Sequence, residues 1–243
     1  MIFVRGQRAD YDSWGAAGAT GWSFEDVEPY FRKIEHWDEE DGSAARGRDG
    51  PLHVCRVHER FPLSEAFLRA ASEDGQRLNP DYNGAEQEGF GYYQVNQYRG
   101  SRWSVVDAYL HPARRRANLK VETGAHVLRV LTDGKRCRGV VYRQGGRDVT
   151  VDAEAEVVLS AGAIGTPRIL ELSGIGDPNC LRGIGVEVSH ALPGVGENYI
   201  DHFCTRMNWR VRNMVTLNEM ARGWRLGLSV AEYVARRTGI LTL

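Results

Sequence analysis

The stretch Glu156–Gly176, EVVLSAGAIGTPRILELSGIG, says more about the fold than any other part of the chain. Its apolar start, Val157-Val158-Leu159, predicts a short buried strand, and the small residues Ser160–Ala163 predict a tight turn. A helix should follow, with Thr166-Pro167 at its start and Gly174 at its end. A joint without bulky side chains lets a ligand approach the backbone, as at nucleotide sites of α/β folds. The alternative is an ordinary strand-to-helix joint whose small residues only allow tight packing.

Strand patterns precede this stretch. Between Leu119 and Val158, short apolar runs are separated by Asp133-Gly134 and Gly145-Gly146, which are typical of tight hairpin turns. The pattern predicts a β-meander that leads into the strand at 156–160. The strands expected in the meander are 121–123, 127–131, 139–142 and 149–151.

Apolar residues at helical spacing mark several other segments. The polar, glycine-rich run Asp38–Gly50 predicts an exposed loop between two of them. Strands and helices together predict an α/β fold with α+β character. The expected helices are 24–37, 63–72, 104–116 and 224–237, and a strand is expected to begin at Arg206 and reach Val211.

Composition excludes several classes of protein. A formal net charge of −1 over 243 residues argues against a nucleic-acid binder. No apolar run approaches the ~20 residues of a membrane span, so no integral membrane segment is expected. The four cysteines and the histidines show no metal-ligand spacing, so no metal site is expected and the thiols should be free in a reducing, cytoplasmic compartment. A peripheral association with the inner membrane stays open.

The spelling of Gly162–Gly176 resembles the second signature of the glucose–methanol–choline (GMC) flavoprotein oxidoreductases. The Gly-Ala pair, the Thr-Pro step and the Ser-Gly-Ile-Gly ending all stand at the spacing of that signature. The wording is similar to choline-dehydrogenase-like members. Further segments that resemble the family are 1–14, 21–31, 79–84 (NPDYNG), 89–94 (GFGYYQ), 109–119 and 192–202.

Two family segments are absent from these 243 residues. No GxGxxG occurs, although family members open with this FAD pyrophosphate-binding turn. The HPxGxCxMG segment with the catalytic histidine is missing too, because His111-Pro112 lacks the Gly-x-Cys-x-Met that should follow. We therefore expect a fragment from the middle of a roughly twice-longer enzyme.

The resemblance implies a function for that enzyme. It would be an FAD-dependent dehydrogenase or oxidase that takes a hydride from the CH–OH group of a small-molecule alcohol to the flavin. Residues 1–202 would be an incomplete FAD-binding region with its β-meander, and 203–243 the beginning of a substrate-binding domain. A non-catalytic binding or structural module of the same fold is the alternative. An NAD-dependent Rossmann enzyme has little support, because its fingerprint is absent.

The resemblance also implies cofactor contacts. Met1, Ile2 and Phe3 match a flavin-contacting stretch, and Val127 occupies the position whose backbone brackets the adenine of FAD. Ala161 and Gly162 are candidates for close approach to the cofactor. From the residues alone, Val127 is more simply a core valine. No catalytic residue is expected in this chain.

Overall fold

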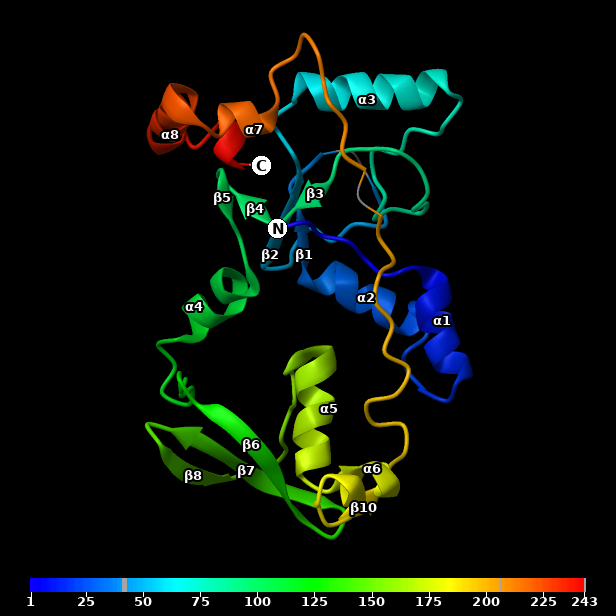
Figure 1. Ribbon diagram of the computed structural model, residues 1–243, viewed down its shortest axis with the longest axis vertical. Coiled ribbons are helices and arrows are strands. Elements are labelled where there is room, and N and C mark those ends of the chain that lie inside the picture. The colour runs from blue at the N-terminus through cyan, green and yellow to red at the C-terminus, as the bar shows by residue number, and fades with distance from the viewer. Residues whose placement is uncertain (41–42, 206, 243) are drawn as a thin grey trace. The chain divides into compact units, whose positions relative to one another are not determined.

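The computed structural model of the chain describes residues 1–40, 43–205 and 207–242. The chain divides into two compact units: residues 1–119 with 209–243 form unit 1, and residues 120–208 form unit 2. Helices and strands occur in both units (Figure 1), which confirms the expected α/β class. None of the described helices is long and apolar enough to cross a membrane.

Unit 2 contains the predicted meander. Strands β6 (His126–Asp133), β7 (Arg136–Gln144) and β8 (Arg147–Asp152) form an antiparallel sheet in the order β6-β7-β8. Gly145 and Gly146 fill the two-residue β7–β8 loop with φ of +56° and +79°. Two consecutive positive φ values define the hairpin turn whose twist matches the strands, and glycine adopts them without strain.

Helix α5 (Gly162–Leu172) follows the meander but begins earlier than predicted. Its N-cap is Ala161 and not Thr166, and Pro167 lies inside the helix. The Thr166 hydroxyl accepts a hydrogen bond from the backbone N–H of Ala161 at 3.1 Å, so it stabilises the start of the helix from within the second turn. Gly174, with φ +80°, lies just after the C-cap, as predicted.

The segment 156–160 belongs to no sheet among the described residues, so the predicted buried strand is wrong. Val158 is 75% exposed. An apolar run becomes a strand only where a neighbouring chain offers backbone donors and acceptors, and no strand of unit 2 lies beside it. The predicted strand at 121–123 fails for the same reason, since β6 begins at His126.

The rest of unit 2 is short. Strands β9 (Ile175–Gly176) and β10 (His190–Ala191) pair in parallel around α6 (Pro178–Gly183). The side chain of Asp177 caps α6 by accepting from the N–H groups of Asn179 and Cys180.

Unit 1 is organised around one small sheet in the order β1-β2-β3. Strand β1 (Glu35–Trp37) runs parallel to β2 (Leu52–Arg56), and β3 (Gln94–Val95) pairs antiparallel to β2. Helix α2 (Phe24–Ile34) therefore ends three residues before the predicted Trp37. Glu35 and Trp37 are buried on both sides of a half-buried His36, and this period of two fits a strand.

The loop between β1 and β2 is not the exposed loop that its composition predicts. Arg46 is 4% exposed, and a Cβ added to Gly47 would lie 2.0 Å from the carbonyl oxygen of Arg32 in α2. Glycine allows the loop to pack directly on the end of that helix. Residues 41–42 of the predicted loop lie outside the described residues.

The remaining elements of unit 1 follow the sequence in part. The predicted helix 104–116 is a π-turn η1 (Val106–Leu110) with a single turn α4 (His111–Ala113), and residues 207–211 form no strand, while Arg206 lies outside the description. The other elements are α1 (Arg8–Ala16), α3 (Pro62–Glu73), β4 (Gln97–Tyr98), β5 (Ser101–Arg102), α7 (Leu217–Met220), α8 (Gly223–Arg236) and η2 (Ile240–Thr242).

Candidate cofactor site

The predicted cofactor residues Met1, Ile2 and Phe3 lie together in unit 1, on the edge of β3. Ile2 forms an antiparallel bridge with Val95. The Phe3 N–H donates to the Gln94 carbonyl at 2.8 Å, and the Met1 carbonyl accepts from the Asn96 N–H at 2.8 Å. The backbone of this segment is fixed, whereas the side chains of Met1 and Ile2 are more than half exposed.

Two side chains of the NPDYNG segment hold the same backbone. The Tyr82 hydroxyl donates to the Phe3 carbonyl at 2.9 Å, and the Asn83 amide donates to it at 3.0 Å. Asn83 also accepts from the Arg5 N–H at 2.7 Å through its own Oδ1. Burial raises the pKa of Tyr82, so its hydroxyl keeps the proton that this contact needs. The segment is thus fixed from both of its polar sides.

A buried ionic network lies beneath this anchor. Glu35 accepts from Arg5 at 2.6 Å and from Arg46, and Arg46 reaches Asp81 at 2.6 Å. The Gln94 side chain accepts from Arg46 at 2.8 Å and donates to Asp81 at 2.8 Å. Burial lowers the pKa of Arg5, and the charge of Glu35 acts in the opposite direction. Two guanidinium groups and two carboxylates therefore balance in a water-poor interior.

The sequence did not indicate this network. Arg46 stands in a polar, glycine-rich run of the kind that normally marks solvent-exposed chain. Its only usable signal is indirect, because Asp81, Asn83 and Gln94 stand in the segments that resemble the family.

Ala161 and Gly162 lie in unit 2, where they form a bare turn at the start of α5. Gly162 has φ +83°, and a Cβ built on it would meet no atom within 4 Å. Both residues are exposed. The first N–H groups of an α-helix have no acceptor within the helix, so they are directed at whatever binds there. The turn therefore offers open main chain and donors, and not packed side chains.

Val127 lies in the same unit on β6, the edge strand of the meander. It pairs with Tyr142 on one side and is half-buried. Helix α5 packs along β6, because the Val130 N–H donates to the Ser173 hydroxyl at 2.9 Å. Val127, Ala161 and Gly162 thus stand on neighbouring elements of one unit. Met1, Ile2 and Phe3 belong to the other unit.

Two histidines behave differently from the expectation that they sit in loops or on open surface. His36 and His53 lie on the paired strands β1 and β2, next to Asp38. Their separation in the sequence matches no common metal motif. Only the register of a parallel strand pair, which the sequence did not predict, brings them together.

The comparisons agree with the sequence resemblance. A model of the family described as GMC oxidoreductase matches residues 1–204. Human mitochondrial choline dehydrogenase is 41% identical over 98% of this chain and 40% of its own length. The oxygen-dependent choline dehydrogenase of Photobacterium profundum is 39% identical over 99% of this chain and 42% of its own length.

Solved structures show the same fold. An FAD-dependent oxidoreductase from Chaetomium thermophilum superposes with a TM-score of 0.86 at 30% identity, covering 100% of this chain and 45% of that one. Formate oxidase, at 24% identity and a TM-score of 0.83, supports the fold alone. The chain spans about two fifths of the length of the two curated relatives. The family match extends over most of these residues, and the chain belongs to the GMC oxidoreductase family.

Proposed function

We propose that this chain forms part of an FAD-dependent oxidoreductase that acts on the CH–OH group of a small alcohol. Choline is the first candidate, because the relatives named above are choline dehydrogenases. The observation that carries the proposal is the bare turn at Ala161–Gly162, where no side chain of the chain fills the space beside the backbone.

The described residues fit such a cofactor. A dinucleotide needs main-chain donors near its charged groups and a surface without bulky side chains. Ala161 and Gly162 offer both, and the edge strand that carries Val127 packs beside the same helix. In unit 1, the half-exposed Met1 and Ile2 offer apolar surface above a backbone that cannot move freely. FAD, when bound, supplies the hydride acceptor.

The part we assign to this chain is binding and orientation. Tyr82 and Asn83 fix the Phe3 carbonyl, and Gln94 fixes the Phe3 N–H, so the segment 1–3 keeps one conformation. We place the catalytic base outside these residues. Residues 203–243 we assign to the beginning of a substrate-binding domain.

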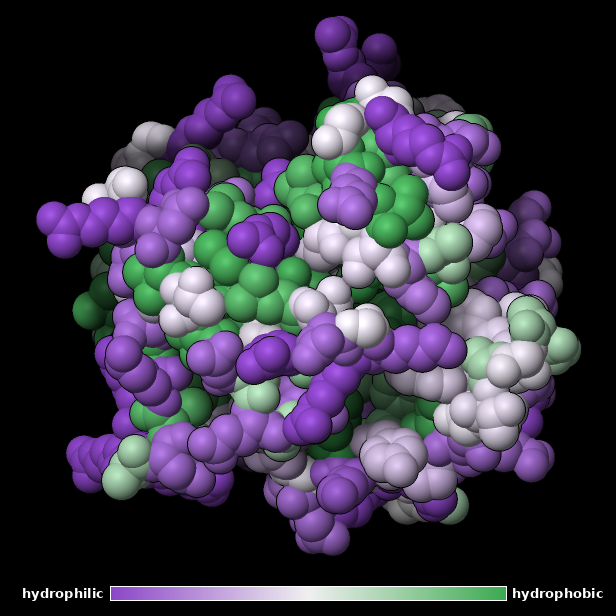
Figure 2. Space-filling view, turned by 90° about the horizontal axis from the view of Figure 1, so that it is seen from below, coloured by the Kyte–Doolittle hydropathy of each residue, from purple (hydrophilic) through white to green (hydrophobic). Residues whose placement is uncertain are grey.

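Exposed apolar residues in unit 2 support a longer parent protein. Figure 2 shows one face of the molecule, on which hydrophobic side chains form patches between charged ones. Val158, Ile164, Ile200 and Phe203 are all more than 70% exposed, which is more than isolated surface residues require. We propose that further segments of the enzyme and the cofactor cover these residues.

The location we propose is a reducing, cytoplasmic compartment, because all four cysteines are free. An association with the inner-membrane surface would be peripheral. Fractionation of cells that express the protein, with a high-salt wash of the membranes, separates these two locations.

A chimera tests the function directly. Residues 1–243 replace the matching part of the Photobacterium profundum enzyme, whose own flanking segments remain. We expect the chimera to bind FAD and to oxidise choline, whereas the 243-residue chain alone should bind FAD poorly and turn over no alcohol. Turnover by the isolated chain would contradict the placement of the base, and a chimera without FAD would contradict the proposal itself.

A matched pair of variants tests the turn. Gly162→Val places a branched side chain over the proposed contact, and Gly185→Val is its control, because Gly185 also has positive φ and open space. Both substitutions cost about 1–2 kcal/mol of backbone strain. Only Gly162→Val should weaken FAD binding by the chimera, by about tenfold or more. Equal effects of the two variants would show that the turn does not approach the cofactor.

A further inference from the structure

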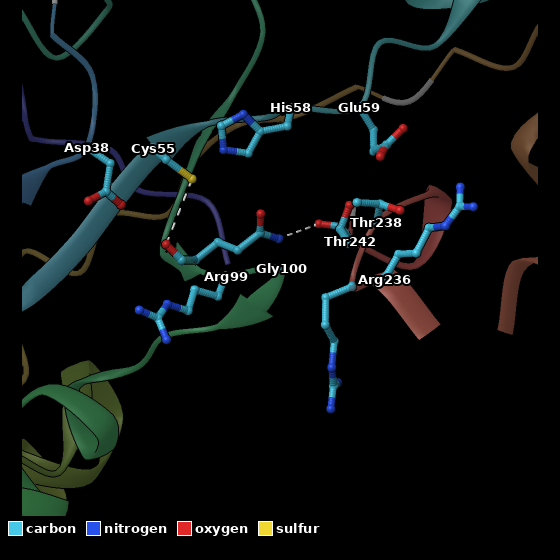
Figure 3. A pocket seen from close by; sticks show the side chains of 11 residues that line it. Asp38, Cys55, His58, Glu59, Arg99, Gly100, Arg236, Thr238 and Thr242 are labelled. Carbon is cyan, nitrogen blue, oxygen red and sulfur yellow. Dashed lines mark hydrogen bonds between the residues drawn. The ribbon is translucent and has the colours of Figure 1, made fainter. Parts of the chain in front are cut away.

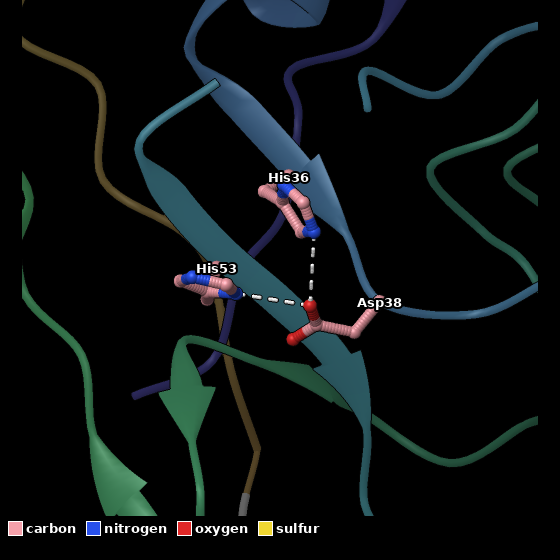
Figure 4. Close-up of side chains that lie close together, drawn as sticks. All are labelled: His36, Asp38 and His53. Carbon is pink, nitrogen blue, oxygen red and sulfur yellow. Dashed lines mark hydrogen bonds and ion pairs between the residues drawn. The ribbon is translucent and has the colours of Figure 1, made fainter. Parts of the chain in front are cut away.

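Three side chains with metal-ligating atoms stand on one face of the β1–β2 pair in unit 1. His36 and His53 are direct partners in the parallel register. Asp38 follows His36 by two residues, and residues two apart along a strand face the same side. Figure 4 shows both imidazole rings directed at the same carboxylate.

The distances suit one small cation. The His53 Nδ1 lies 2.9 Å from the Asp38 Oδ1, and the His36 Nε2 lies 3.5 Å from the same oxygen. The three ligand atoms all lie within 4.8 Å of one another. Four ligands at the usual Zn²⁺ bond lengths of about 2.0–2.1 Å in a tetrahedron are about 3.3 Å apart. Small rotations of the side chains therefore bring all three atoms to bonding distance.

The face that carries these side chains is already ordered. The ring of His53 stacks on Tyr98 at a centroid distance of 4.1 Å and contacts the edge of Trp103 at 5.4 Å. The Trp103 indole N–H donates to the Pro51 carbonyl at 2.9 Å, which fixes the indole in turn. The side chain of His53 is 19% exposed. Metal binding would therefore cost little ordering of His53.

The site is open on one side. Asp38 lines a hollow of about 460 Å³ in unit 1, between the β2–β4 region and the end of α8 (Figure 3). The side chain of His36 is 41% exposed. Both observations leave room for water as a further ligand, as in sites with three protein ligands.

We propose that His36, Asp38 and His53 bind one divalent transition-metal ion of the Zn²⁺ class. Two imidazole nitrogens and one carboxylate oxygen are ligands that Zn²⁺ accepts, and Cu²⁺ and Ni²⁺ compete for the same set. The ion would join β1 to β2 and so stabilise the sheet that anchors the N-terminal segment. This site is independent of the proposed function, because it requires neither FAD nor an alcohol.

Titration of the 243-residue chain tests the site. The chain is first treated with EDTA, and the binding of Zn²⁺ is followed by calorimetry and that of Co²⁺ by visible absorption. We expect one equivalent of each metal to bind, with nitrogen and oxygen ligands only. A thiolate-to-Co²⁺ charge-transfer band would overturn the proposal, because the exposed Cys180 and Cys204 would then be the ligands.

Variants locate the ligands. His53→Gln and Asp38→Asn should each lower the affinity for Zn²⁺ by about 10–100-fold or more. His36→Gln provides a second test on the most exposed of the three side chains, where a loss of folding is least expected. His58→Gln is the control, because it removes a histidine of the same unit that lies outside the cluster. Circular dichroism confirms that each variant folds. Unchanged affinity in the folded cluster variants, or an equal loss in the control, would overturn the site.

Discussion

The carbonyl oxygen of Phe3 accepts a hydrogen bond from the side-chain amide of Asn83 at 3.0 Å, across 80 residues of chain. This contact explains why the NPDYNG segment and the N-terminal segment occur together. One provides the side chains that fix the other, and neither segment has a regular partner that could replace the contact.

Replacing Asn83 should loosen the N-terminal segment. Asn83→Ala removes the donor to Phe3 and the acceptor of the Arg5 N–H, and leaves both backbone groups without these partners. We expect a loss of about 1–3 kcal/mol in the free energy of unfolding. Hydrogen exchange should become faster at the amides of Phe3 and Arg5 first. Asn118→Ala, at an exposed position, serves as the control, and equal loss in both variants would contradict the anchor.

Neutralising Glu35 should cost more. Its carboxylate is fully buried and contacts both Arg5 and Arg46, so Glu35→Gln leaves two buried cations with only Asp81. Removing one partner of a buried ion pair costs about 3–5 kcal/mol. Urea denaturation followed by circular dichroism measures the change.

The control for Glu35 is Glu25→Gln. Glu25 is exposed and lies 3.9 Å from Arg8, so its loss should change stability by no more than about 1 kcal/mol. A Glu35→Gln variant as stable as this control would show that the network contributes nothing to folding.

The contact between α5 and β6 predicts a local effect in unit 2. Ser173→Ala removes the acceptor of the Val130 N–H, and Val130 is buried. A buried donor without a partner costs about 1–3 kcal/mol, and the Val130 amide should exchange faster. Ser189→Ala is the control, because the hydroxyl of Ser189 contacts only the exposed side of Thr132. Unchanged exchange at Val130 would contradict the contact.

Cys55 predicts a dependence on alkaline pH. Burial, with smaller effects of Asp38 and Glu39, raises the pKa of this thiol to about 12, whereas an unfolded cysteine ionises near pH 8.5. The raised pKa stabilises the folded state below about pH 8.5, and this stabilisation is lost as the pH rises toward 12. Wild-type stability should therefore fall relative to Cys55→Ala between about pH 8.5 and 10. Parallel pH profiles of the two proteins, in EDTA, would contradict the raised pKa.

The local parts of the fold could be predicted from the sequence. The hairpin turn at Gly145-Gly146, the meander and the helix at the C-terminal end all depend on short-range rules of turn geometry and periodicity. The predicted strand at 156–160 failed because a strand needs a partner, and the apolar run alone does not supply one. The helix predicted to reach Trp37 failed because Glu35 is drawn into a buried ionic network, which periodicity does not encode.

The candidate site divides in the same way. The sequence by itself determined the family and the bare turn at Ala161–Gly162, because small residues before a helix are a local pattern. Only the tertiary structure decided that Arg46 is buried, that Asn83 holds Phe3, and that His36 and His53 share one face with Asp38. Each of these contacts joins residues distant in sequence through strand register or buried charge, and both arise only when the chain has folded.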